Sequence, residues 1–239
     1  IVPVTLELGG KSPNIVFQDA DLETALEGTI KAIFVNAGQV CCAGTRLLLE
    51  NSIYERFVDR LIERTRRITV GPGLEDPDMG PLISETQRKR VMSYIELGLN
   101  EGGRLLLGGR IPDAAACHRG YFVEPTLIDG VSNTARVAQE EIFGPVLTIL
   151  RFSTEEEATR LANESPFGLV AGVWTANLDR AHRMASKIDA GQIYINDFFS
   201  GAVASPFGGY KRSGFGRERG LEALQHYTQV KSVCARINA

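Results

Sequence analysis

Short apolar runs alternate with amphipathic helical patterns along almost the whole chain. The clearest apolar runs are residues 14–17, 46–50, 146–152 and 169–174. Strands of a parallel sheet are buried on both faces, so they read as continuous apolar runs, and a helix usually connects one strand to the next. The alternation therefore predicts an α/β fold with a mostly parallel sheet and helices on both faces.

Several helical patterns follow a side chain that can cap a helix. Asp21 precedes one pattern, and the pairs Ser52 with Glu55 and Ser84 with Gln87 have the spacing of a capping box. In this arrangement each side chain bonds a backbone N–H that the helix itself leaves without a partner. We expect helices to begin just after these capping residues.

Composition excludes some partners. The chain has 239 residues, 44% of them hydrophobic, and a net charge of −3, so it lacks the basic footprint of a nucleic-acid-binding protein or of an anionic membrane surface. No run of about 18 apolar residues predicts a membrane span. The four cysteines suggest no disulfide framework, and reduced thiols fit a cytoplasmic location.

The sequence predicts no metal site. His118, His182 and His226 are dispersed, and Cys117 is adjacent to His118 instead of standing at a chelating spacing. We interpret Cys117 and Cys234 as small hydrophobic residues, which is the usual role of an unpaired cysteine.

The neighbouring cysteines Cys41 and Cys42 lie between Gly38 and Gly44 in a polar loop. Glycine permits close backbone approach, so a small molecule could reach a thiol there. A free thiol has a pKa near 8.5, and only about a few per cent is thiolate at pH 7. From these residues alone, a reactive and a structural role are equally supported.

Glu7 is followed by Leu8 and then by Gly9 and Gly10. A carboxylate beside two glycines suits a general base that must move toward a substrate. A surface residue at the end of a strand is the alternative interpretation of Glu7, and local sequence does not separate the two.

Taken together, the motifs resemble those of the aldehyde dehydrogenase superfamily. The resemblance covers essentially the whole chain, and the motifs occur in the family's order: Glu7 to Pro13, the cysteine loop at 38–46, Gly80 to Leu82, Glu140 to Pro145, Asn163 to Gly168, Pro206 to Lys211 and Gly214 to Glu218.

The resemblance implies a mechanism in which Cys41 attacks an aldehyde to form a thiohemiacetal. After hydride transfer, Glu7 would activate the water that hydrolyses the resulting thioester, giving a carboxylic acid. Cys42 would be a bystander. Glu141 and Phe143 match the family's contacts to the nicotinamide side of the cofactor, and Gln87 matches a lesser cofactor contact.

The resemblance also implies NAD or NADP as cofactor, but the family's dinucleotide-binding half has no counterpart here. We expect a catalytic domain over residues 1–224 and a strand over 225–239 that forms a homo-oligomer. This chain alone is expected not to complete dehydrogenation. The alternatives are a cofactor-independent thiol esterase and an inactive oligomerising fragment, the latter because the alternating residues 227–237 predict a strand whose free edge recruits partners.

Overall fold

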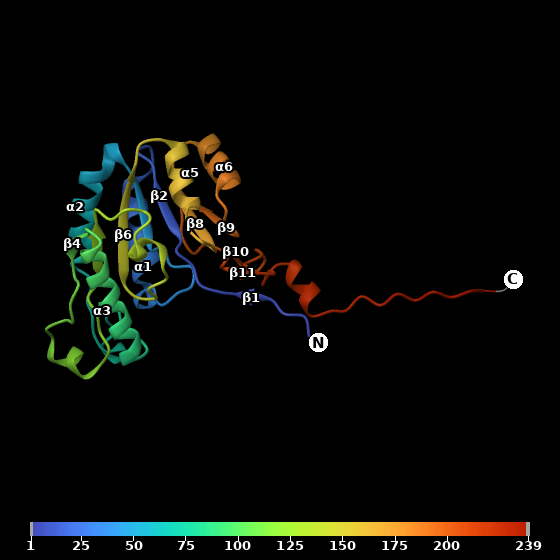
Figure 1. Ribbon diagram of the computed structural model, residues 1–239, viewed down its shortest axis with the longest axis horizontal. Helices are drawn as coiled ribbons and strands as arrows, with labels where there is room; N and C mark the ends of the chain where they lie inside the picture. The colour runs from blue at the N-terminus through green and yellow to red at the C-terminus, as the bar shows by residue number, and fades with distance from the viewer. Residues whose placement is uncertain (1, 238–239) are drawn as a thin grey trace.

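A seven-stranded sheet forms the centre of the computed structural model, which describes residues 2–237 (Figure 1). The strand order is β4-β5-β6-β3-β2-β8-β9, and every neighbouring pair is parallel except β4 with β5. The strands are β2 (Pro13–Val16), β3 (Arg46–Glu50), β4 (Arg104–Leu107), β5 (Thr126–Asp129), β6 (Val146–Phe152), β8 (Val170–Trp174) and β9 (Gln192–Ile195). The predicted mostly parallel α/β fold is confirmed.

Burial explains why these strands could be predicted. All residues of β2, β5 and β8 are buried, as are nearly all of β3 and β6. Central strands covered on both faces read as near-continuous apolar runs, which makes them visible in a sequence. The edge strand β4 is antiparallel, and its first two residues are exposed.

Six α-helices connect and cover the described strands: α1 (Leu22–Phe34), α2 (Tyr54–Thr65), α3 (Glu85–Asn100), α4 (Arg136–Gln139), α5 (Glu155–Asn163) and α6 (Leu178–Lys187). Helix α1 packs on α2, and α5 packs on α6. Right-handed crossovers place α1 and α5 on opposite faces, because β2 to β3 and β6 to β8 run in opposite directions across the sheet. None of the helices in residues 2–237 is long and apolar enough to cross a membrane.

Two of the three predicted helix starts are confirmed. The Asp21 side chain accepts from the N–H groups of Glu23 and Thr24, and the Ser84 hydroxyl accepts from the Gln87 N–H. The predicted start after Ser52 is wrong, because residues 51–53 form a 3₁₀ turn and α2 begins at Tyr54 without a side-chain cap. The Ser52 hydroxyl donates to Gln18 instead.

Two short pairings lie outside the central sheet. Strand β1 (Leu6–Glu7) pairs antiparallel with β11 (Gly214–Phe215), and β7 (Phe167–Gly168) pairs with β10 (Tyr210–Lys211). The glycine-dense region near the C-terminus therefore folds back onto the start of the chain. It also contacts the segment between α5 and β8.

The predicted terminal strand at 227–237 is not formed in this chain. These residues are exposed and lie outside every strand of the described residues, and Figure 1 shows them running away from the body of the molecule. A strand forms only where a neighbouring strand shares its hydrogen bonds, and no strand of residues 2–237 pairs with this segment.

Candidate active site

The cysteine loop begins with a left-handed turn at the end of α1. Asn36 and Ala37 have φ of 53° and 54°, and Gly38 has φ of 70°. At Gly38 only glycine fits, because a Cβ would lie 2.2 Å from the carbonyl oxygen of Gly144. The turn delivers Cys41 half-buried just before β3, and Cys42 follows it into the core.

Glu7 reaches the same place from a separate strand. It lies on β1 opposite Gly214, whose φ of 112° and close approach to the Leu6 carbonyl oxygen require glycine. The Leu8 N–H donates to the Ser213 carbonyl oxygen at 3.1 Å. The Oε1 atom of Glu7 is buried and receives no hydrogen bond from the described residues.

Gly9 and Gly10 follow the strand that carries Glu7, and both the cysteine loop and the Glu141 side chain lie close to them. A Cβ on Gly10 would lie 2.7 Å from the Cys41 carbonyl oxygen, and one on Gly9 would lie 2.2 Å from Oε2 of Glu141. The Gly10 N–H also donates to Oε1 of Glu141 at 3.3 Å. Three of the residues expected from sequence, Cys41, Glu7 and Glu141, are thus brought together around these two glycines.

The two thiols influence each other strongly. Contact with the Cys42 thiol, burial and the neighbouring Glu7 carboxylate together raise the pKa of Cys41. The same contact lowers the pKa of Cys42, although burial opposes this. Cys42 is only 7% exposed, so Cys41 is the thiol that a small molecule can reach. The Glu7 carboxylate lies beside this reachable thiol.

Gln87 and Phe143 lie next to Glu141: Phe143 is on the same segment, and Gln87 bonds the backbone of that segment. Phe143 is half-buried with a left-handed φ of 61°. The Gln87 side-chain amide donates to the carbonyl oxygens of Ile142 and Phe143 at 2.9 and 2.7 Å. Both of its donor contacts therefore hold the backbone that carries Glu141 and Phe143.

The sequence did not reveal two buried residues, Ser213 and Arg46, whose side chains hold the backbone on either side of Gly10. The buried Ser213 hydroxyl donates to the Gly9 carbonyl oxygen at 2.7 Å and accepts from the Gly168 N–H at 3.0 Å. The buried Arg46 guanidinium donates to the Lys11 carbonyl oxygen at 2.9 Å. The sequence does carry a signal for Ser213, because five glycines lie close to it, at positions 208, 209, 214, 216 and 220, and such density is typical of a shaped loop.

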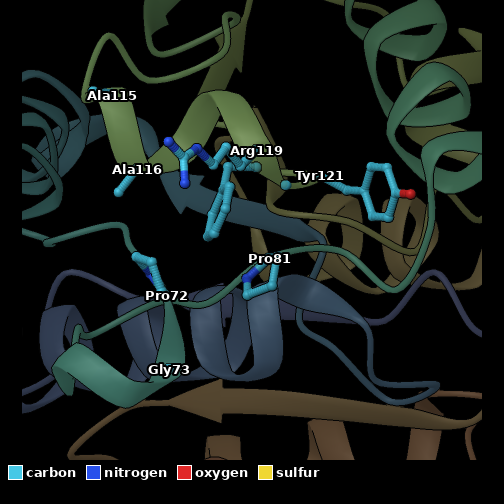
Figure 2. Close-up of a pocket in the computed structure, with 9 residues that line it drawn as sticks. Pro72, Gly73, Pro81, Ala115, Ala116, Arg119 and Tyr121 are labelled. Atoms are coloured by element: carbon cyan, nitrogen blue, oxygen red, sulfur yellow. The ribbon is translucent and has the colours of Figure 1, made fainter.

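A sizeable cavity lies elsewhere. It has a volume of about 620 Å³ and opens between the loop after α2 and the turn before β5, as Figure 2 shows. Phe122 and Pro81 line it together with Arg119, the one charged residue in its wall. None of the site residues expected from sequence belongs to this wall. Among the described residues, no group of three or more His, Cys, Asp or Glu side chains could hold a metal.

The fold and these side chains define an α/β domain with a thiol and a carboxylate at one site. A family model described as "Aldehyde dehydrogenase family" matches residues 1–233, and the chain belongs to this family. A betaine aldehyde dehydrogenase of Brucella melitensis biotype 2 is 52% identical over 231 residues, which is 96% of this chain and 47% of that protein. The chain therefore spans about half the length of the curated relatives it matches.

Solved structures of aldehyde dehydrogenases have the same fold over most of this chain. An aldehyde dehydrogenase from Bacillus cereus in its NAD⁺ complex superposes with a TM-score of 0.94 at 46% identity, covering 99% of this chain and 48% of that one. A betaine aldehyde dehydrogenase from Staphylococcus aureus in complex with NAD⁺ gives a TM-score of 0.91 at 44% identity, covering 93% of this chain and 44% of that one.

Proposed function

We propose that this chain is the catalytic part of an NAD(P)-dependent aldehyde dehydrogenase that oxidises an aldehyde to a carboxylic acid. The observation that carries the proposal is the gathering of Cys41, Glu7 and Glu141 around Gly9 and Gly10. Residues 1–224 would form the catalytic domain, and residues 225–239 the oligomerisation segment.

Cys41 is the proposed nucleophile. Loss of its proton to a base gives a thiolate, which attacks the aldehyde carbon and forms a C–S bond. The backbone N–H of Cys41 would supply part of the stabilisation of the oxyanion that results, and the loss of one such donor typically costs about 10²–10³ in rate.

When bound, NAD(P)⁺ would supply the hydride acceptor. Loss of hydride from the carbon of the thiohemiacetal would leave a thioester on Cys41. The residues present fit a nicotinamide ribose: Glu141 is half-buried, and its side chain receives only the 3.3 Å hydrogen bond from Gly10 among the described residues. Its remaining lone pairs can accept ribose hydroxyls. Phe143 would contact the nicotinamide ring, and Gln87 would keep the loop in place.

Glu7 is the proposed base for the second half of the reaction. Its buried Oε1, without a hydrogen bond from the described residues, would take a proton from water. The hydroxide attacks the thioester carbonyl, the C–S bond breaks, and the carboxylic acid leaves while Cys41 regains a proton.

Betaine aldehyde is the first substrate to test, because relatives at 52% identity carry that name. The whole protein that contains this chain should reduce NAD⁺ or NADP⁺ with an aldehyde, seen at 340 nm, and Cys41→Ala should abolish the signal while Cys42→Ala keeps it. Reduction by the Cys41→Ala protein at the parent rate would refute the assignment. The 239-residue chain alone should not reduce NAD⁺ or NADP⁺.

A thiol esterase activity is the second candidate, because the thiol and its base both lie within this chain. It predicts cleavage of p-nitrophenyl acetate by the chain without cofactor. This cleavage should vanish in Cys41→Ala.

Self-association is supported by apolar exposure at the two ends of the chain. Val4 is 65% exposed, and Tyr227, Val230 and Val233 are each more than 80% exposed. A segment with this pattern is expected to pair with a strand of a second copy. Sedimentation of the chain should show an oligomer that truncation after residue 224 converts to monomer.

A further inference from the structure

The turn that precedes Cys41 has an unfavourable backbone conformation. Asn36, Ala37 and Gly38 are three consecutive residues with positive φ. Only glycine adopts this region without steric cost, so Asn36 and Ala37 stay there only where surrounding contacts impose it. The contacts that hold this turn therefore decide where the chain enters the cysteine loop.

The side chains of Asn36 and Gln39 close the turn. The Asn36 side-chain amide donates to the Gln39 carbonyl oxygen at 3.0 Å, and the Gln39 side-chain amide donates to the Asn36 carbonyl oxygen at 3.1 Å. The backbone N–H of Gln39 donates to the same Asn36 oxygen at 3.1 Å. These bonds are local, so they shape the turn but do not place it relative to the rest of the fold.

Gln39 also ties the turn to a segment that is distant in the sequence. Its Oε1 atom accepts from the backbone N–H of Ile83 at 2.8 Å, and its Nε2 atom lies 3.4 Å from the Pro81 carbonyl oxygen. The Ile83 side chain is 80% exposed, so Ile83 holds Gln39 through its backbone. The half-buried Gln39 amide thus joins the cysteine loop to residues 81–83.

The segment that Gln39 contacts leads directly into α3. Ser84 follows Ile83 and caps this helix, and Gln87 in its first turn donates to the Phe143 carbonyl oxygen at 2.7 Å. Hydrogen bonds at both ends of this short segment therefore link the turn before the thiol to the backbone proposed to face the nicotinamide.

The other side of the cysteine loop is held independently. The bend that contains both cysteines is closed by a hydrogen bond from the Ala43 N–H to the Val40 carbonyl oxygen at 3.0 Å. The Gly44 N–H then donates to the Ala32 carbonyl oxygen of α1 at 2.9 Å. Gln39 directly precedes this bend, so the loop has one anchor on α1 and another on residues 81–83.

We propose that Gln39 is a positioning residue for Cys41: its side-chain amide holds the turn before the thiol against the backbone of residues 81–83. The inference rests on the proposed function, in which Cys41 attacks an aldehyde and hydride leaves the resulting thiohemiacetal. Both steps need a fixed geometry, and a displacement of about 1 Å can cost about 10²-fold in rate. Without this amide the left-handed turn would relax, and Cys41 would lose its place relative to α3.

Hydrogen exchange of the whole protein that contains this chain, followed by mass spectrometry, tests the anchor itself. Gln39→Met removes both hydrogen-bonding groups at nearly the same side-chain length. The amides of residues 39–44 and of Ile83 should then exchange about fivefold faster or more, as expected for the loss of one hydrogen bond. Unchanged exchange in both segments would overturn the proposal.

Gln18→Met is the matched control for this measurement. It also removes a bond between two segments, because the Ser52 hydroxyl donates to the Gln18 side chain. Gln18 follows β2 whereas Cys41 precedes the parallel strand β3, so the two lie at opposite edges of the sheet. This substitution should leave the exchange of residues 39–44 and of Ile83 as it is in the parent.

A single-turnover measurement tests the consequence for the reaction, with enzyme and NAD⁺ or NADP⁺ in saturating excess over betaine aldehyde. Gln39→Met should lower the rate constant for formation of the reduced cofactor by about 10- to 10²-fold. An unfolded fraction reduces the amount of active enzyme but not this rate constant, so a merely structural role would not change it. Gln39→Glu keeps an oxygen for the Ile83 N–H and should retain most of the parent rate constant.

A parent rate constant in Gln39→Met would overturn the positioning role, and so would a Gln39→Glu protein as slow as Gln39→Met. If Gln39→Met does not fold, Gln39→Asn replaces it with the same expectations, because its amide is one methylene group short of Ile83. If the parent forms no reduced cofactor, the proposed function fails, while anchoring by Gln39 is judged by hydrogen exchange alone.

Discussion

The carboxylate of Glu141 occupies the space that a Cβ at position 9 would need, 2.2 Å from Oε2. At position 10 the neighbour is different, because a Cβ there would lie 2.7 Å from the carbonyl oxygen of Cys41. One glycine therefore makes room for the movable end of a side chain, and the next makes room for backbone.

This difference predicts losses of stability of different size for two matched alanine substitutions. Gly9→Ala should displace the Glu141 side chain while the free energy of unfolding falls by less than about 1 kcal/mol, since a side chain can rotate away. Gly10→Ala should cost more and slow alkylation of Cys41 by iodoacetamide, since the cysteine backbone must shift. Urea unfolding and the alkylation rate measure both effects. Equal stability losses in the two variants would contradict this account.

Glu7→Gln should separate the two halves of the chemistry. If the chain cleaves p-nitrophenyl acetate through Cys41, the variant should still release a burst of about one p-nitrophenol per site. Steady turnover should fall by about 10²-fold or more, because general base catalysis typically contributes about 10²–10⁴-fold. Stopped-flow absorbance at 405 nm resolves both phases, and unchanged steady turnover would rule Glu7 out as the base of deacylation.

The sequence was sufficient for the parts of the fold that are buried on both sides. Strands β3 and β6 are apolar along most of their length because the sheet is covered on both faces. Strands β1 and β11 have two residues each, too few for any periodicity, and tertiary contact alone sets their pairing. Ser52 failed as a helix cap for a related reason, since its hydroxyl bonds Gln18 from a distant segment.

Some residues of the candidate site could likewise be predicted from sequence motifs, whereas the roles of others depend on tertiary contacts. Cys41 and Glu7 were expected from motifs, and they lie together. The role of Gln87 could not be predicted from the neighbouring sequence. Its spacing from Ser84 predicts a capping box, whereas its amide donates to the carbonyl oxygens of Ile142 and Phe143, which are distant in the sequence. Lys11 was visible in a motif, but its burial against Arg46 is a property of the folded chain.

Arg46→Met should destabilise the fold strongly. The guanidinium donates to three backbone carbonyl oxygens and to the Asn133 side chain, and its loss leaves these acceptors buried without donors. Leaving buried groups unsatisfied predicts a loss of about 3 kcal/mol or more in the free energy of unfolding. Urea titration measures it. The matched control is Arg110→Met, whose exposed pair with Glu124 should contribute less than about 1 kcal/mol.

Lys11 predicts a pH dependence of stability. In the fold its pKa is lowered to about 7 from an ordinary value of 10.5, so between these values the unfolded chain binds a proton that the folded chain does not. Stability due to this group therefore rises from pH 7 to 10.5, and its cost is fully present below pH 7. Lys11→Met should be more stable than the parent by a few kcal/mol at pH 6, with the gap closing toward pH 10. A constant gap in urea unfolding across this range would contradict the assignment.

The β1–β11 pairing has a further consequence. The proposed nucleophile, Cys41, is anchored beside a seven-stranded sheet, whereas the proposed base, Glu7, lies on a two-residue strand that pairs with a loop from the far end of the chain. Detaching that loop would remove the base and leave the nucleophile where it is. A molecule in that condition could still be acylated on Cys41 but could not release the acyl group, and it would accumulate as a stalled thioester.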